Sequence, residues 1–243
     1  MARCDGVIIK QSDFGEGHRM LWIFTDKFGI IKAVAHGAQR AKSKSGAATQ
    51  FLAFCSFDFY ESGEIWTINS AAAKDTFWPI QENIEKLALC TYLADITFYS
   101  LEMSNPDIPV LRLLLNTLYG CAYKKIPCSM IKTIYELKLM YMAGFMPLPD
   151  CCQSCGAAGG KMYLDTLSGG IFCENCRAAS YVPLDEDMYK CIYCIIHCDM
   201  KKMFSVSYPE EAMAALSAPI EKYITHNLGK NIKSLDYYKI IRS

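Results

Sequence analysis

The first third of the chain carries short apolar runs broken by turn residues, as in a β domain. Turn signals at residues 26–29 (Asp-Lys-Phe-Gly) and 61–64 (Glu-Ser-Gly-Glu) separate these runs, and a longer polar connection covers residues 37–49. The runs predict five β-strands, at residues 6–11, 18–25, 30–35, 51–60 and 65–71. Five strands in so short a stretch suit a small barrel or sandwich, and the OB-fold barrel has this strand count and size.

The pattern changes near Trp78 to the three- and four-residue spacing of amphipathic helices. Gly144 and Gly229 are typical residues for ending a helix. The predicted helices cover residues 83–103, 110–123, 129–143, 185–200 and 210–228. We therefore predict an α+β chain of more than one domain, with a five-stranded OB-fold barrel over residues 1–78 and an α-helical domain over residues 79–243.

Two cysteine pairs interrupt the helical part. Cys152 and Cys155 are separated by two residues, as are Cys173 and Cys176, and seventeen residues lie between the pairs. This spacing is typical of zinc sites, because each short turn brings two thiolates to one side of an ion. We expect a zinc-finger insertion at residues 150–178 that holds one structural Zn²⁺ through these four cysteines.

The segment between the pairs predicts a short hairpin, with strands at residues 162–165 and 171–172 around a Ser-Gly-Gly turn. Such a segment has too few apolar residues to fold alone, so metal binding would supply its folding free energy. Two alternatives stay open. The four cysteines could be reduced without metal, or Cys151 could replace its neighbour Cys152 as a ligand.

The chain has thirteen cysteines, an odd number, so complete disulfide pairing would leave one thiol over. A second group of potential ligands has helical spacing: Cys191, Cys194, His197 and Cys198. Four ligands on one short helix cannot surround an ion tetrahedrally, so we favour core packing of this face over metal binding. We interpret the scattered cysteines as small buried side chains: Cys4, Cys55, Cys90, Cys121 and Cys128.

Basic residues gather in a window without acidic residues, between Asp26 and Asp58. Because the chain has 25 basic and 25 acidic residues, any nucleic-acid site must be a local patch of this kind. OB-folds bind single strands with a positive groove and exposed rings. The candidate DNA-binding residues are Lys32, His36, Arg40, Lys42 and Lys44. The candidate rings are Phe14, Trp22, Phe28 and Trp66. The alternative is a solvated loop beside aromatic residues of the core.

A second basic run closes the chain and alternates with tyrosines. It consists of Lys222, Lys230, Lys233, Lys239 and Arg242. This run could extend a DNA path or receive an acidic peptide. We favour a third interpretation, the exposed face of a terminal helix.

Motifs of several enzyme classes are absent from the sequence. It has no G-x-x-x-x-G-K-[ST] phosphate loop, no H-E-x-x-H and no G-x-S-x-G. None of the four histidines is paired with a plausible nucleophile, which leaves few candidates for general acid–base chemistry. We therefore expect a non-enzymatic protein. The apolar run at residues 7–9 is too short for a signal peptide or a membrane span, which favours a cytosolic protein without a membrane partner.

Three further motifs accompany the predicted order of barrel, helices and inserted cysteine pairs. A Gly-x-x-Arg-x-Lys-Ser loop begins at Gly37, after the third predicted strand. Residues 135–139 (Tyr-Glu-Leu-Lys-Leu) lead through Gly144 into the cysteine pairs, and residues 226–230 (His-Asn-Leu-Gly-Lys) lie near the end of the chain. Together with the metal spacing, these motifs resemble the RecO family of recombination mediators, along essentially the whole chain.

The resemblance implies an N-terminal OB-fold and a helical domain with a zinc finger. It implies binding of single- and double-stranded DNA, annealing of complementary strands, and action with RecR in helping RecA displace SSB, the single-stranded-DNA-binding protein. RecF is a further possible partner, and the acidic tail of SSB is an expected contact. The expected location is the bacterial cytoplasm, in association with the nucleoid. Two other hypotheses are a zinc-ribbon interaction scaffold that never touches DNA and a zinc enzyme acting on nucleic acid. The enzyme would need an open coordination position, against which four thiolates argue.

Overall fold

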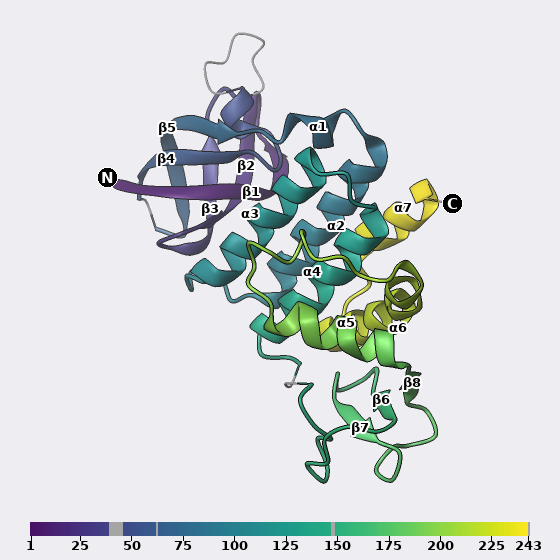
Figure 1. Ribbon diagram of the computed structural model, residues 1–243. Helices are drawn as coiled ribbons and strands as arrows, with labels where there is room; N and C mark the ends of the chain where they lie inside the picture. The colour runs from purple at the N-terminus through teal and green to yellow at the C-terminus, as the bar shows by residue number, and fades with distance from the viewer. Residues whose placement is uncertain (39–45, 62, 147–148, 243) are drawn as a thin grey trace.

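The N-terminal part of the protein is a closed five-stranded barrel with the strand order β1-β2-β3-β5-β4 (Figure 1). Its strands are β1 (Ala2–Phe14), β2 (His18–Thr25), β3 (Gly29–Ala35), β4 (Phe54–Tyr60) and β5 (Ile65–Asp75). The computed structural model describes residues 1–38, 46–61, 63–146 and 149–242. This arrangement confirms the predicted OB-fold barrel.

The apolar residues of the barrel belong to two hydrophobic cores, one inside the barrel and one shared with the helical part. This division arises because successive side chains of a strand point to opposite faces. Ile8 and Leu21 point into the barrel. Val7, Ile9 and Phe24 point outward and join the core of the helical part. The run Val7-Ile8-Ile9 is continuously apolar because both faces of β1 are covered at this point.

The strand boundaries differ from prediction at both ends of β1. This strand pairs with β4 from Ala2 to Val7 and with β2 from Gly6 to Phe14, so its length is set by two partners rather than by its own pattern. β4 begins only at Phe54, because the chain is still turning at Leu52, which has a φ of 69°.

Seven α-helices follow the barrel in the described part of the chain (Figure 1). They are α1 (Trp78–Gln81), α2 (Ile84–Ser100), α3 (Ile108–Tyr123), α4 (Cys128–Met142), α5 (Glu186–His197), α6 (Glu210–Leu228) and α7 (Lys233–Arg242). Helix α4 lies in the centre, against α2, α3, α5 and α6. The five predicted helices are all present within a few residues. The short α1 was missed. Of the terminal basic run, Lys233, Lys239 and Arg242 lie on α7, whereas Lys222 lies on α6 and Lys230 lies between the two helices.

A close backbone contact joins the barrel to the helical part. Gly29 opens β3 with a φ of +64°, and a Cβ at this position would lie 2.5 Å from the backbone nitrogen of Asn105. The next residue, Ile30, accepts a hydrogen bond from the Ser104 N–H at 3.2 Å. Glycine therefore allows the barrel to meet the α2–α3 connection at this point.

A small antiparallel sheet lies at the end of the molecule opposite the barrel (Figure 1). Its order is β7-β6-β8, with β6 (Met162–Leu164), β7 (Ile171–Cys173) and β8 (Val182–Leu184). The β6–β7 hairpin is the predicted one, and β8 was not anticipated. Within the described residues, no helix combines the length and the apolar character that crossing a membrane requires.

Candidate functional site

Two tight turns position the four cysteines of the small sheet. In the first turn, Cys152 N–H donates to Ala157 O at 2.8 Å, and Gly156 N–H donates to Cys152 O at 2.9 Å. In the second, Cys173 O accepts from the N–H groups of Cys176 and Arg177, both at 3.0 Å. A Gln153 N–H bond to Ile171 O, 2.9 Å long, ties the first turn to the strand that carries the second.

The four sulfur atoms of these turns converge on one point. The Sγ atoms of Cys152, Cys155, Cys173 and Cys176 all lie within 4.8 Å of one another, and those of Cys155 and Cys173 are 3.7 Å apart. Zinc–thiolate bonds of about 2.3 Å in a tetrahedron give a sulfur–sulfur edge of about 3.8 Å. The cluster therefore has the size and the donor set to hold a metal ion.

Interactions within the cluster shift the pKa values of its thiols in opposite directions, lowering that of Cys152 and raising those of Cys155 and Cys176. Backbone hydrogen bonding at Cys173 is the largest influence on the pKa of the Cys152 thiol, which is lowered to about 6. The thiolate is the form that binds metal. Cys151, its neighbour in sequence, lies outside the group of converging sulfurs.

The cysteines of α5 are arranged differently. Cys191 is buried in the helical core, and Cys194 and Cys198 pack against that core. His197 turns instead toward Asp150, with 2.9 Å between the imidazole Nε2 and the carboxylate. Among the described residues, the only cluster suited to an ion is the one in the small sheet.

The candidate DNA-binding residues of the barrel fall into two groups. Lys32 is half-buried on β3, with its ammonium 5.4 Å from the centroid of the Trp22 ring. His36 is exposed, and its ring meets the His18 ring edge-on at 4.7 Å. The remaining three candidates lie outside the described residues: Arg40, Lys42 and Lys44.

The candidate rings are dispersed over the barrel. Phe14 is exposed at the end of β1. Phe28 and Trp66 meet edge-on at 4.9 Å beside a cavity of about 240 Å³ that Lys27 and Lys32 also line. Trp22 lies on the outer face of the barrel and partly contacts the helical core.

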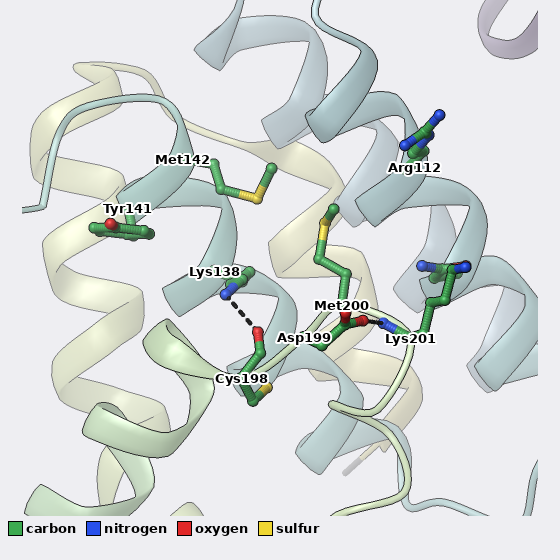
Figure 2. A pocket seen from close by; sticks show the side chains of 9 residues that line it. Arg112, Lys138, Tyr141, Met142, Cys198, Asp199, Met200 and Lys201 are labelled. Atoms are coloured by element: carbon green, nitrogen blue, oxygen red, sulfur yellow. Dashed lines mark hydrogen bonds between the residues drawn. The ribbon is translucent and has the colours of Figure 1, made fainter.

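Sequence reasoning missed a second basic site, a pocket of about 710 Å³ between the helices (Figure 2). Its cations are Arg112 on α3, Lys138 on α4 and Lys201 after α5, and its apolar lining includes Met142 and Met200. The Lys138 ammonium donates to the Cys198 carbonyl at 3.1 Å, and burial lowers the pKa of Lys138. A signal existed, since Arg112 and Lys138 both interrupt apolar helices.

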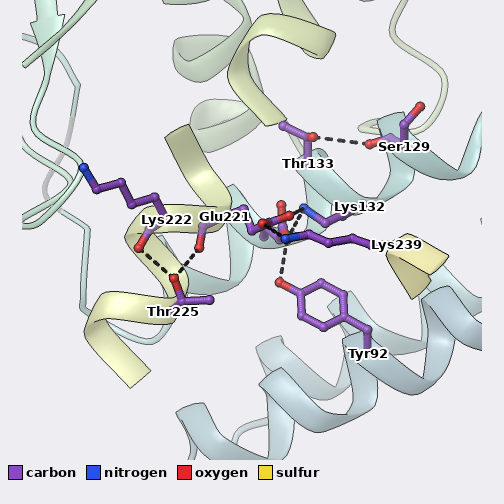
Figure 3. A network of polar contacts seen from close by, with 9 residues as sticks. Tyr92, Ser129, Lys132, Thr133, Glu221, Lys222, Thr225 and Lys239 are labelled. Carbon is purple, nitrogen blue, oxygen red and sulfur yellow. Dashed lines mark hydrogen bonds and ion pairs between the residues drawn. The ribbon is translucent and has the colours of Figure 1, made fainter. Parts of the chain in front are cut away.

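Sequence reasoning also missed a charged network inside the helical core (Figure 3). Lys132 of α4 lies 2.8 Å from Glu136 and 3.3 Å from Glu221 of α6, and its side chain is only 2% exposed. The Tyr92 hydroxyl of α2 donates to Glu136 at 2.6 Å, and Lys239 of α7 pairs with Glu221. The network therefore links four helices.

Fold and site together define a class of protein, a five-stranded OB-type barrel followed by a helical domain with a four-cysteine cluster that could hold a metal. Comparison with known families is more specific. The family model "Recombination protein O N terminal" matches residues 1–77, and "Recombination protein O C terminal" matches residues 81–236. The chain belongs to the RecO family of DNA repair proteins, which confirms the resemblance and assigns it a DNA repair role.

Individual relatives agree with this assignment over their whole lengths. The chain is 28% identical to the DNA repair protein RecO of Acetivibrio thermocellus over 242 residues, which cover 98% of this chain and 96% of the relative. It is 28% identical to the DNA repair protein RecO of Caldicellulosiruptor saccharolyticus over 243 residues, which cover 99% of this chain and 98% of the relative. It is 29% identical to that of Oceanobacillus iheyensis over 239 residues, covering 96% and 91%. RecO is not a recognised family of catalytic enzymes.

Proposed function

We propose that the protein is a recombination mediator that binds single- and double-stranded DNA and anneals complementary strands. With RecR it would help load RecA onto single strands coated with SSB, with RecF and RecA as indirect partners. The observation that carries this proposal is the match to both RecO family models, one over the barrel and one over the helical domain. Such a role would place the protein in the cytoplasm, at the nucleoid.

In this proposal the barrel neutralises phosphates. Lysines and arginines on β3 and in the following loop reduce the repulsion between two negatively charged strands, which allows the strands to pair. Phosphate contacts carry no sequence information, so all sequences would bind alike. The domain division would be residues 1–78 for DNA, residues 79–243 for the helical part, and residues 150–178 for the zinc finger.

The metal in this proposal is one structural Zn²⁺, held by the four converging cysteines. A closed set of four thiolates leaves no open position for a reacting water, which supports a structural role in a non-enzymatic protein. The ion would hold the two turns of the small sheet together and stiffen the surface presented to protein partners.

The basic loop can be tested by combined substitution. We expect the quadruple change of Lys32, Arg40, Lys42 and Lys44 to alanine to weaken DNA binding for all sequences and to flatten its salt dependence. We expect the native protein to make about 3–6 phosphate contacts. Their number follows from the slope of log affinity against log salt concentration, because each contact releases counterions. Fluorescence anisotropy of a labelled single strand at several salt concentrations measures both quantities.

The matched control removes three exposed lysines and one exposed arginine elsewhere: Lys125, Lys161, Lys190 and Arg177. It changes net charge equally and should leave most of the affinity in place. Equal losses in the two variants would show that the loop has no special role. If the native protein binds no DNA even at low salt, the mediator proposal fails, and the zinc-ribbon interaction scaffold becomes the better account.

The basic pocket of the helical part supports contact with the acidic SSB tail. Arg112 and Lys201 beside the methionine side chains of the pocket suit a peptide that presents carboxylates and apolar side chains together, although Asp199 also lines the pocket. We expect Arg112→Ala and Lys201→Ala each to weaken binding of the SSB tail peptide by about 1–2 kcal/mol, or roughly 5- to 30-fold. Calorimetry with the isolated peptide measures this, with Lys125→Ala as the control. Unchanged affinity in both pocket variants would place the tail elsewhere.

A further inference from the structure

A series of cation–ring contacts crosses the outer face of the barrel. The ammonium groups of Lys32 on β3 and Lys10 on β1 lie 5.4 and 5.3 Å from the centroid of the Trp22 ring on β2. Lys10 also lies 4.9 Å from the ring of Phe98, which belongs to α2. The contacts therefore leave the barrel and reach the helical domain.

The series continues along α2. The rings of Phe98 and Tyr99 meet edge-on with 5.5 Å between their centroids. The ammonium of Lys230, in the connection between α6 and α7, lies 4.5 Å from the Tyr99 ring. Three cations and three rings are thus linked in one cation–aromatic row: Lys32, Trp22, Lys10, Phe98, Tyr99 and Lys230.

Strand register produces the barrel half of the row. Lys10 is directly opposite Trp22, and Trp22 is directly opposite Lys32, across three neighbouring strands. An irregularity in β1 between Ile8 and Lys10 shifts the register and brings Lys10 beside Trp22. The sequence neighbour Leu21 points into the barrel, so the row lies on the outer face of the barrel, at the place where Trp22 and Phe98 pack against the edge of the helical core.

The charges of the row are available for a ligand. Among the described residues, no carboxylate forms an ion pair with Lys10, Lys32 or Lys230. Asp95, one helical turn before Tyr99, accepts a hydrogen bond from Ser234 at 2.6 Å. The lysine ammonium groups are therefore free to pair with an anionic chain.

We infer that the cation–aromatic row is a track for single-stranded DNA that carries the strand from the barrel onto the helical domain. Each nucleotide offers one flat base and one phosphate, and the row offers three rings with ammonium groups beside them. Rings can stack only on unpaired bases, whereas lysines bind the phosphates of either form. The row therefore favours a single strand over a duplex. This inference rests on the proposed DNA binding and adds to it a site that includes Tyr99 and Lys230.

The helical half of the row provides the test. Tyr99→Leu removes a stacking ring, and we expect about a ten-fold loss of affinity for a labelled single strand but little change for a duplex of equal length. Tyr99→Phe keeps the ring and should keep native affinity. Lys230 is exposed. Lys230→Ala should reduce the slope of log affinity against log salt concentration by about one, for the single strand and for the duplex alike. Lys161→Ala, exposed on the small sheet, is the control for lost charge.

Two outcomes would overturn the track alone, and a third would overturn the proposed function with it. One is native single-strand affinity in both Tyr99→Leu and Lys230→Ala. Another is equal loss of single-strand and duplex binding in Tyr99→Leu, which would point to a structural defect rather than to stacking. In the first of these cases, weaker binding by the loop quadruple variant, which includes Lys32, would leave the proposed function standing while Tyr99 and Lys230 lose their role in the track. If the native protein binds no DNA, both fail together.

Discussion

The Cys155→Ser variant is expected to lose the metal and to loosen the two cysteine turns of the small sheet while the barrel stays folded. Structural zinc contributes on the order of 10–16 kcal/mol in small metal-dependent folds, so loss of one thiolate should lower metal affinity by orders of magnitude. The strands of the sheet also pack on the helical core through Met162, Leu164 and Ile171, so the loss of order should be largest around the four cysteines and smaller in the strands. Metal analysis and hydrogen exchange measure the two effects, and exchange should rise across residues 150–178 but not in β1–β5.

Cys151→Ser is the matched control. It makes the same chemical change next to a ligand, but Cys151 lies outside the group of converging sulfurs, so metal content should be native. Cobalt substitution should give the absorption of a tetrahedral four-sulfur site in the control and not in Cys155→Ser. Metal loss in Cys151→Ser would instead assign the ligand to position 151, and full metal content in Cys155→Ser would refute the four-cysteine site.

The predictable parts of this protein are those with local signals. Turn residues and short apolar runs between them predict the five strands, because both signals lie within a few residues of each strand. The cysteine turns were equally local, since two ligands in one turn require only short spacing. The helices followed from their periodicity, and their ends differ from prediction by a few residues.

The missed features depend on partners far away in the sequence. β1 extends to Ala2 because β4 pairs with it, and β8 exists only beside β6. The row of Lys10, Trp22 and Lys32 requires a strand irregularity that the apolar pattern does not reveal. Residues of the pocket and of the row come from separate helices and strands, so their proximity becomes visible only when the chain is folded.

The charged network of α4 was missed for a related reason. A charged residue within an amphipathic helix is normally assigned to the solvent face. Yet Lys132 and Glu136 are 2% and 0% exposed, since α4 is surrounded by other helices. Lys132 contacts Glu221 and Tyr92 donates to Glu136, so the two charges are compensated within the core (Figure 3).

Lys132→Met is expected to destabilise the protein by about 3–5 kcal/mol, because it leaves the buried Glu136 without its cation. Urea unfolding measures the loss. Lys190→Met is the matched control, since Lys190 and Glu186 form the same i, i+4 pair with side chains 64% and 81% exposed. That control should change the free energy of unfolding by less than about 0.5 kcal/mol. The double variant Lys132→Met/Glu136→Gln should recover much of the loss, because the amide oxygen can still accept from Tyr92.

The same pair predicts the direction of a pH effect. Burial raises the pKa of Glu136, and Lys132 opposes this rise, so removing the lysine should raise the pKa further. An acid with a raised pKa in the folded state destabilises that state when ionised. For Glu136, this destabilisation becomes smaller as the pH falls through the pKa of the folded state. It vanishes below the pKa of the unfolded state, about 4.3. The stability deficit of Lys132→Met should therefore narrow between neutral and mildly acidic pH. A deficit that is constant or grows as pH falls would show that Glu136 does not carry the buried charge, and the loss would then be one of packing.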